Sequence, residues 1–368
     1  MEEANMKFLH MADMHFDSPF TLLNSKGDFG KIRRLEQREI FQKIIQYIKE
    51  NQIEYLLIAG DFYEHEYIGK STIEYINGLF QTIPETKIFI TPGNHDPYLK
   101  NSMYATFPWS ANVKIFSSTI EVVETPEADI YGVGFDDFSC DNLGVENIQI
   151  KNQNKINILI THGTLDGSSQ TELPYNMMKK NNLKKLGFDY IALGHIHKPD
   201  YNSEENQTII YPGSTISRGF DELGQHGAIV GNIEKNYLQI KFVPMDNREF
   251  QELLFPINDI LDMETLEQKI NELNLENNIL YKIILTGKRK FEISISTLNK
   301  LIDQKNIIKI KDETEPDIDI EAFANETTLK GIFVKEILEE MKKNTENKEM
   351  QEQLEKALEI GLSILDKS

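Results

Sequence analysis

Residues 6–15, MKFLHMADMH, decide the fold, because a short apolar run ends directly on two side chains that can bind a metal ion. A mostly apolar run of this length is typical of a strand buried inside a sheet. Asp13 and His15 are separated by one residue. Side chains alternate along an extended chain, so both point to the same side. The stretch therefore predicts a buried strand that carries two ligands at its carboxyl end.

The same arrangement recurs along the chain, in EYLLIAGD (54–61), KIFITPGNHD (87–96), INILITH (156–162) and DYIALGHIH (189–197). Helical apolar spacing lies between the first strands, at 31–50 and 71–82, and this alternation indicates βαβ units. In open α/β sheets, ligands bind beyond the carboxyl ends of the strands. We therefore expect one cluster of polar side chains, made of Asp13, His15, Asp61, Asn94, His95, Asp96, His162, His195 and His197.

The chemistry of this cluster is that of a metal site without thiolates. Carboxylates, imidazoles and an amide oxygen favour Mn, with Fe or Zn as alternatives, over a structural zinc or Mg alone. The two oxygens of Asp61 allow it to bridge two cations. Taken singly, a D-x-H pair, an H-x-H pair or a G-D turn is common and usually without function. Their ordered combination at strand ends indicates a two-metal centre.

The ordered motifs D-x-H (13–15), G-D-x-x-E (60–64), G-N-H-D (93–96), His162 and G-H-x-H (194–197) resemble those of the calcineurin-like metallophosphoesterase superfamily. The resemblance covers roughly residues 6–245. It implies an α/β fold, a β-sandwich flanked by helices. It also implies one divalent cation held by Asp13, His15, Asp61 and His197, and a second held by Asp61, Asn94, His162 and His195.

The resemblance also implies a mechanism. A water activated between two cations attacks phosphorus, while the cations offset charge on the attacking and leaving oxygens. His95 resembles the superfamily's histidine that is not a ligand, and would bind a phosphate oxygen or protonate the leaving oxygen. Asp96 would hold the ring of His95 in orientation.

Within the superfamily, three features resemble the SbcD-type DNA repair nucleases, particularly the YhaO-like branch. These are the opening at 6–20, the pair Y-P-G-S (211–214) and R-G-F-D-E (218–222), and the order of the domains. This implies a DNA exonuclease or endonuclease of DNA repair that acts with an SbcC-like coiled-coil ATPase. The alternatives are a small-molecule or nucleotide phosphodiesterase or phosphatase of the same fold, and a scaffold that binds without catalysis.

The surface gives a mixed indication about DNA. The formal net charge of −20 argues against a surface that coats nucleic acid, since phosphate contacts need Lys and Arg. Predicted DNA contacts are a basic cluster after the first motif and a histidine beside Asp61, namely Lys31, Arg33, Arg34, Arg38 and His65. The alternative for the cluster is a solvated helix face, and for His65 a solvated loop.

Three domains are predicted: the phosphoesterase domain at 6–245, a small α/β capping domain at 246–326 and a helix-loop-helix at 327–368. The last carries two apolar stripes, one of Ile332, Phe333, Ile337, Leu338 and Met341, the other of Leu354, Leu358, Leu362 and Leu365. These helices either pack on each other or on the cap, or bind the coiled coil of the ATPase. The sequence leaves a homodimer open.

The remaining composition favours a cytoplasmic protein with no membrane partner. Cys140 is the single cysteine, so no intrachain disulfide can form, which suits a reducing compartment. The acidic start lacks the features of a signal peptide. Apolar runs such as 55–59 are too short to span a bilayer.

Overall fold

The computed structural model describes residues 5–20, 29–166, 175–201, 207–317, 320–345 and 347–365. The chain forms two compact units. The first contains Met1–Leu253, Leu273–Ile283 and Asp303–Ile310, and the second contains Leu254–Glu272, Ile284–Ile302 and Lys311–Ser368.

The first unit contains a six-stranded sheet with the order β11-β10-β1-β2-β3-β4. Four neighbouring strands run parallel, β1 (Met6–Met11), β2 (Tyr55–Ala59), β3 (Lys87–Thr91) and β4 (Val113–Ile115). The hairpin of β10 (Gly227–Glu234) and β11 (Tyr237–Pro244) joins β1 in antiparallel direction. The carboxyl ends of β1, β2 and β3 therefore lie at one edge of the sheet.

A five-stranded sheet has the order β5-β6-β7-β8-β9. Its strands β6 (Ala128–Gly132), β7 (Ile156–His162), β8 (Tyr190–Gly194) and β9 (Ile209–Ile210) run parallel, and β5 (Glu121–Glu124) is antiparallel at the edge. The carboxyl ends of β7 and β8 carry His162 and His195, as the sequence predicts.

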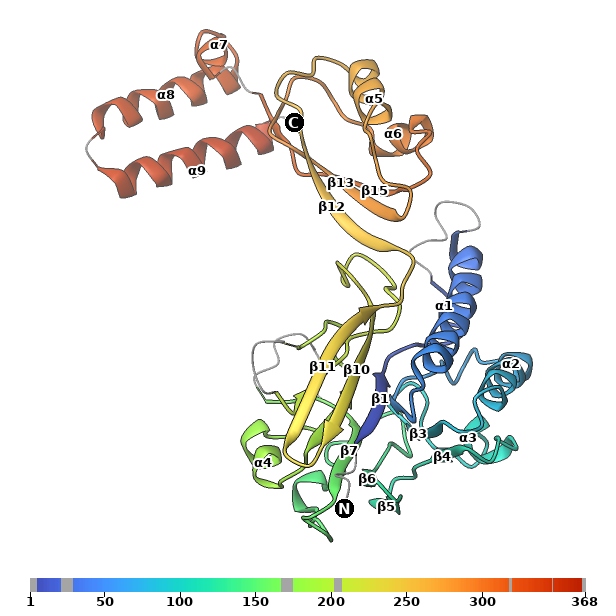
Figure 1. The fold of residues 1–368 in the computed structure, drawn as a ribbon. Coiled ribbons are helices and arrows are strands. Elements are labelled where there is room, and N and C mark those ends of the chain that lie inside the picture. Colours follow the sequence, from blue (N-terminus) through green and yellow to red (C-terminus); the bar gives the residue numbers. More distant parts are fainter. Residues whose placement is uncertain are drawn as a thin grey trace. The chain divides into compact units, whose positions relative to one another are not determined.

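The two sheets pack face to face. Side chains alternate along β1 and β2, so one set enters the core between the sheets and the other set enters the core under the helices. Phe8 and Tyr55 lie in the core between the sheets, together with Ile158 of β7 and Tyr190 of β8. The intervening residues of β1 and β2 face the other way. There they pack against α1 (Phe29–Asn51), α2 (Lys70–Gln81) and the short α3 (Met103–Thr106) (Figure 1).

The second sheet is covered on its outer face by α4 (Lys180–Lys185) and a 3-10 turn, η2 (Val145–Asn147), through Leu183 and Val145. The layers are thus helices, sheet, sheet and helices. The predicted α/β sandwich flanked by helices is confirmed.

A three-stranded sheet follows, formed by β12 (Glu249–Pro256), β13 (Ile279–Thr286) and β15 (Ile307–Asp312). The helices α5 (Met263–Asn271) and α6 (Ile295–Leu301) lie between these strands in the sequence, and β14 (Lys288–Arg289) pairs with β16 (Glu315–Pro316). Asp262 caps α5 by accepting a hydrogen bond from the Thr265 backbone N–H, and Ser294 caps α6 in the same way at Thr297.

The first unit reaches beyond the predicted boundary at residues 245 and 246. Phe250, Leu280 and Ile308 belong to its core, and the ring of Phe250 lies 5.0 Å from that of Phe220, edge to face. Sequence alternation shows that a strand has an apolar face but not which core that face joins. The predicted domain boundaries therefore differ from the compact units of the structure.

The chain ends in α7 (Ile320–Ala324), α8 (Leu329–Lys343) and α9 (Lys348–Leu365). Val334 of α8 packs with Leu358 and Leu362 of α9 in a small core of their own, which Phe323 and Phe333 border. Part of each predicted apolar stripe therefore packs on the neighbouring helix. Ile332, which was predicted in the first stripe, is instead 56% exposed.

Candidate metal centre

The loops that follow β1, β2, β3, β7 and β8 meet at one place, because the two sheets present their carboxyl ends together. The imidazole Nδ1 of His162 donates to the carbonyl of Ala59 at 2.9 Å, which ties the end of β7 to the end of β2. A Cβ at Gly194 would lie 1.8 Å from the same carbonyl, and a Cβ at Gly93 would lie 2.2 Å from Asp61 Oδ1. Glycine at these two positions permits the close approach of the strand ends.

The backbone is strained where the ligands leave the strands. Asp13, His15 and Asp61 have φ values of 51°, 47° and 48°, in the left-handed region that residues other than glycine rarely adopt. Asp13 and His15 donate backbone N–H bonds to the carbonyls of Gly60 and Asp61, at 3.1 and 2.9 Å. These bonds hold the two loops side by side in the strained geometry, and strain of this kind is concentrated at functional sites.

The first group of ligand atoms comes from Asp13, His15 and His197, which lie close enough together to hold one ion. His15 Nδ1 lies 2.9 Å from Glu64, and His197 Nδ1 lies 2.7 Å from Glu222, so each ring donates its Nδ1 proton to a carboxylate. The Nε2 atoms then carry lone pairs. They face each other at 3.3 Å.

Two lone pairs at that distance repel unless something positive lies between them. Nitrogens bound to one cation at about 2.1 Å are about 3.0 Å apart in octahedral geometry and about 3.4 Å apart in tetrahedral geometry. The observed 3.3 Å falls within this interval. The two histidines are therefore arranged as ligands of the same ion.

The second group comes from Asp61, His162 and His195. Since His162 Nδ1 is bonded to Ala59, its Nε2 faces two oxygens, Asn94 Oδ1 at 3.1 Å and Asp61 Oδ2 at 3.3 Å. His195 Nε2 is buried and has no hydrogen-bond partner among the described residues. A second cation would satisfy all of these atoms.

Asp61 connects the groups, because its Oδ2 lies 3.8 Å from His15 Nε2 and 3.3 Å from His162 Nε2. This is the placement that a bridging carboxylate needs. The donor set of carboxylates, imidazoles and one amide oxygen fits two divalent cations of the Mn, Fe or Zn kind.

Proton affinities in the centre show how strongly it attracts positive charge. Burial would lower the pKa of His162, but Asp61 raises it to about 9, so the position in which we place a cation attracts positive charge. Burial would raise the pKa of Asp61, but His162 and His95 hold it well below its usual range. Burial lowers the pKa values of His15 and His195 to about 3, which keeps both imidazoles neutral and ready to bind a metal.

His95 lies beside the ligands, with its ring 4.8 Å from that of His15. Its backbone N–H donates to Asp61 Oδ1 at 2.8 Å, and its Nδ1 lies 2.9 Å from Glu64 Oε2. Burial would lower the pKa of His95, but Asp61 and Glu64 raise it to about 9. Cations at Asp61 would oppose this rise. The ring is 43% exposed, so its Nε2 can meet a substrate.

The prediction that Asp96 orients the His95 ring is wrong, because Glu64 holds that ring. Asp96 is fully buried and accepts backbone N–H bonds from Gly93 at 2.6 Å, Phe62 at 2.7 Å and Asp61 at 3.0 Å. The hydroxyl of Tyr104 also donates to it. Asp96 thus fixes the loops that carry Asp61 and His95.

The prediction of Arg33 as a DNA contact is also wrong. Its side chain is 1% exposed and pairs with Asp246, while Nη2 donates to the carbonyl of Ser217 at 3.0 Å. The amphipathic pattern of α1 shows which of its residues are charged. It does not show that Arg33 forms an ion pair inside the core.

The other predicted contacts remain closer to solvent. Arg34 is half-buried and reaches the carbonyl of Pro19, Arg38 donates to Thr72 at 2.8 Å, and Lys31 is exposed. His65 packs edge-on against the exposed ring of Phe138, and its backbone N–H donates to the His95 carbonyl at 3.0 Å. His65 therefore adjoins the centre, and its role with DNA stays a prediction.

Three residues of the centre received no role from the sequence. Glu64 accepts from both His15 and His95, Glu222 accepts from His197, and Arg218 lies between the two carboxylates. The G-D-x-x-E motif and the segment R-G-F-D-E were visible signals. Their pairing with histidines far away in the sequence was not.

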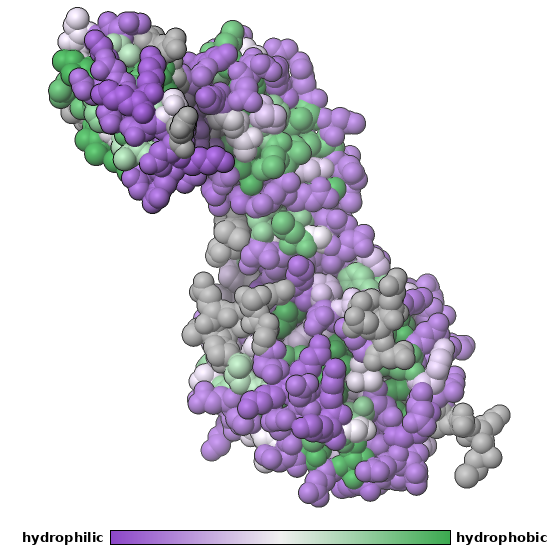
Figure 2. Space-filling view, turned by 90° about the vertical axis from the view of Figure 1, so that its left-hand side faces the viewer, coloured by the Kyte–Doolittle hydropathy of each residue, from purple (hydrophilic) through white to green (hydrophobic). Residues whose placement is uncertain are grey.

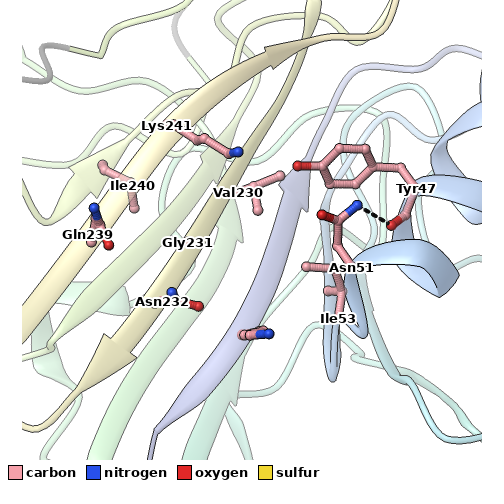
Figure 3. A pocket seen from close by; sticks show the side chains of 10 residues that line it. Tyr47, Asn51, Ile53, Val230, Gly231, Asn232, Gln239, Ile240 and Lys241 are labelled. Carbon is pink, nitrogen blue, oxygen red and sulfur yellow. Dashed lines mark hydrogen bonds between the residues drawn. The ribbon is translucent and has the colours of Figure 1, made fainter.

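A cavity of about 300 Å³ in the first unit does not belong to the centre. It is lined by Tyr47 and Asn51 of α1 and by Gln239 and Lys241 of β11 (Figure 3). Lys7 and Ile53 also line it. They lie at the start of β1 and just before β2, at the edge of the sheet opposite to the ligands.

The sequence model of the calcineurin-like phosphoesterase family matches residues 6–199, which include every residue of the two ligand groups. The chain belongs to this family. Calcineurin-like phosphoesterases bind two divalent metal ions, and the two groups supply ligand atoms that could hold such ions. The chain is accordingly a metal-dependent hydrolase of phosphoesters.

Two relatives extend the similarity. The uncharacterized metallophosphoesterase YhaO of Bacillus subtilis is 25% identical over 73% of this chain and 67% of its own length. The SbcD component of the nuclease SbcCD from Staphylococcus epidermidis is 29% identical over 76% of this chain and 79% of its own length. A crystal structure of a dimetal phosphatase from Danio rerio has a TM-score of 0.40 and 8% identity, covering 66% of this chain and 97% of that one. No helix among the described residues has the length and apolar character that crossing a bilayer requires.

Proposed function

We propose that this phosphoesterase is a two-metal DNA nuclease of DNA repair that acts with a coiled-coil ATPase in the cytoplasm. The phosphodiesterase chemistry is supported by two groups of ligand atoms that Asp61 joins. The groups are Asp13, His15 and His197, and Asp61, His162 and His195. Bound cations would activate a water and offset the charge that develops on phosphate oxygens.

The residues of the chain have separate roles in this proposal. Asp61 would hold both cations, and Glu64 would keep the His95 ring turned so that Nε2 faces the substrate. His95 would then stabilise a phosphate oxygen or pass a proton to the leaving oxygen. Asp96 keeps the Asp61 and His95 loops in place through the backbone.

Similarity beyond the shared domain favours DNA as the substrate. The family match ends at residue 199, whereas the similarity to the SbcD component of the SbcCD nuclease covers 76% of this chain. That relative is by name one part of a nuclease. The native cation in our proposal is Mn, with Fe or Zn as alternatives.

The helices α8 and α9 are the proposed site for the ATPase. Their mutual core leaves several apolar side chains in solvent, Leu329 (71%), Ile332 (56%), Ile360 (52%) and Ile364 (62%). Apolar residues are visible at the surface of the part that includes these helices (Figure 2). An exposed apolar face on a helical hairpin suits another helix as partner.

The deciding experiment compares substrates under one condition. Metal-stripped protein is supplied with Mn and given end-labelled duplex DNA, single-stranded DNA and bis-p-nitrophenyl phosphate. We expect hydrolysis of bis-p-nitrophenyl phosphate and cleavage of DNA from its labelled ends. Hydrolysis of the small diester without any cut in DNA, with the ATPase present or absent, would contradict the nuclease proposal.

One observation favours the alternative, a small-molecule or nucleotide phosphodiesterase. The loop after Phe135, whose ring lies 5.8 Å from that of His162, carries three exposed acidic residues, Asp136, Asp137 and Asp141, and the whole chain has a net charge of −20. Acidic side chains repel a long polyanion more than a substrate with a single phosphate. The substrate comparison above separates these functions.

A further inference from the structure

Arg218 occupies a position that the metal chemistry alone does not require. It lies in the segment between Gly213 and Gly224, and its side chain is 23% exposed. Nε lies 3.3 Å from Glu222 Oε1, Nη1 lies 3.6 Å from Glu64 Oε1 and Nη2 lies 3.2 Å from His197 Nδ1. The guanidinium therefore touches both carboxylates that orient the imidazoles of the first group.

The proton on His197 belongs to the bond with Glu222. Glu222 Oε1 lies 2.7 Å from His197 Nδ1 and accepts its proton. The guanidinium of Arg218 has only donors, so it cannot accept this proton. Arg218 thus does not replace the carboxylate. It lies beside the Nδ1–carboxylate bond and stabilises the negative charge of Glu222.

Glu222 is fixed from several sides, so its position is well defined. Its Oε2 accepts from Ser214 Oγ at 2.9 Å and from the Arg218 backbone N–H at 3.1 Å. Glu64 lies in the loop after β2, where its backbone N–H donates to the carbonyl of Phe16 at 3.0 Å, and its carboxylate contacts the rings of His15 and His95 and the guanidinium of Arg218. Arg218 is the side chain that connects the Glu222 carboxylate with the Glu64 carboxylate.

The consequence is geometric. Glu64 orients His15, Glu222 orients His197, and the Nε2 atoms of these two rings must lie 3.3 Å apart to share an ion. The guanidinium donates from Nε to Glu222 and lies 3.6 Å from Glu64, within ion-pair distance, so its charge draws the two carboxylates toward each other. We propose that Arg218 is a positioning residue that sets the His15–His197 separation and thereby the affinity of the first cation site. This proposal rests on the proposed two-metal function and adds a residue to it.

The alternative role is direct contact with the substrate phosphate, and the two roles predict different measurements. Loss of a positioning residue weakens one cation site, because partners of metal-bound histidines typically contribute about 10- to 100-fold to metal affinity. Loss of a substrate contact raises KM for the diester and leaves metal binding unchanged.

The test uses the full-length chain and the variants Arg218→Gln, Arg218→Lys and Arg248→Gln. Arg248 is the matched control, because it pairs with Glu36 at 2.6 Å and is 21% exposed, close to the exposure of Arg218, but contacts none of the described residues of the centre. Metal-stripped proteins are titrated with MnCl2 by calorimetry. Hydrolysis of bis-p-nitrophenyl phosphate is then followed at several Mn concentrations.

For Arg218→Gln we expect one of two Mn sites to weaken by about 10- to 100-fold, with KM at saturating Mn unchanged. Arg218→Lys is expected to lie between Gln and the natural residue, since lysine keeps the charge but cannot span two carboxylates. Arg248→Gln is expected to bind Mn as the unaltered protein does. Unchanged Mn affinity in Arg218→Gln, or equal weakening in Arg248→Gln, would overturn the proposal. Absence of diester hydrolysis in the unaltered protein would contradict the proposed function, and the calorimetric comparison would still decide the role of Arg218.

Discussion

The Nε2 atoms of His15 and His197 face each other at 3.3 Å, although 182 residues separate them in the chain. Each ring donates its Nδ1 proton to a carboxylate, so two neutral rings present only lone pairs to each other at Nε2. The fold therefore holds together two groups that repel unless a proton or a metal cation lies between them. This relationship makes metal binding part of the stability of the protein as well as of its chemistry.

The first prediction concerns the bridge. Asp61→Asn removes the negative charge that both groups share, so we expect loss of diester hydrolysis and weaker binding of both cations in a folded domain. Metal content of the purified variant and calorimetric titration with MnCl2 measure the binding, and circular dichroism checks the fold. Two cations retained at the affinity of the unaltered protein would show that Asp61 does not bridge.

The second prediction concerns His95, whose ring is held by Glu64 and not by Asp96. His95→Ala is expected to keep both cations and to lower kcat by about 100- to 10,000-fold, the range of general acid–base groups. Metal content and rate are measured on the same sample. If metal and activity disappear together, His95 is a ligand and our assignment fails.

The third prediction concerns DNA contacts. Arg34→Ala combined with Arg38→Ala is expected to weaken DNA cleavage and to leave hydrolysis of the small diester unchanged. Each lost contact to a duplex phosphate is expected to reduce the slope of log affinity against log salt by about 0.9. The slope is measured by DNA binding between low and moderate salt. Equal losses with both substrates would assign these residues to the scaffold.

The fourth prediction concerns Arg33, which lies in the core with its partner Asp246. Arg33→Ala leaves a buried carboxylate without its partner, so we expect a loss of about 3–5 kcal/mol in the free energy of unfolding. Urea denaturation measures it. The neighbouring substitution Arg34→Ala is the control and is expected to change stability by about 0.5 kcal/mol or less. Similar values for the two variants would mean that the pair contributes little.

The fifth prediction concerns the terminal helices. Because α8 and α9 form a core with each other, truncation after residue 326 is expected to leave metal binding and small-diester hydrolysis intact. It is expected to abolish co-purification with the ATPase and any ATP-stimulated cleavage of DNA. A truncated protein that still binds the ATPase would place the contact elsewhere. A truncated protein that aggregates by itself would show that the helices complete the fold.

The sequence predicts the parts of the centre that depend on strand ends. Asp13, His162 and His195 follow directly from buried strands, and the sheets bring those ends together. Spacing within a motif carries this information because a strand has a fixed period.

Relations between distant side chains were harder to predict. The family resemblance implied Asp96 as the partner of His95, yet the loop directs Asp96 to backbone N–H groups and leaves Glu64 within reach of the ring. Arg33 was predicted as a DNA contact because no local pattern reveals its partner, which lies 213 residues further along the chain. Such pairings depend on tertiary packing, which no local pattern contains.

The left-handed backbone at Asp13, His15 and Asp61 has a consequence for the evolution of this fold. Left-handed residues other than glycine cost on the order of 1 kcal/mol each, and glycine would adopt the same backbone without that cost. Relief of this strain would favour glycine at these positions and would remove the ligands with it. In a lineage of this fold that no longer needed phosphoester hydrolysis nothing would maintain the strained residues, so only continued selection for catalysis keeps them in place.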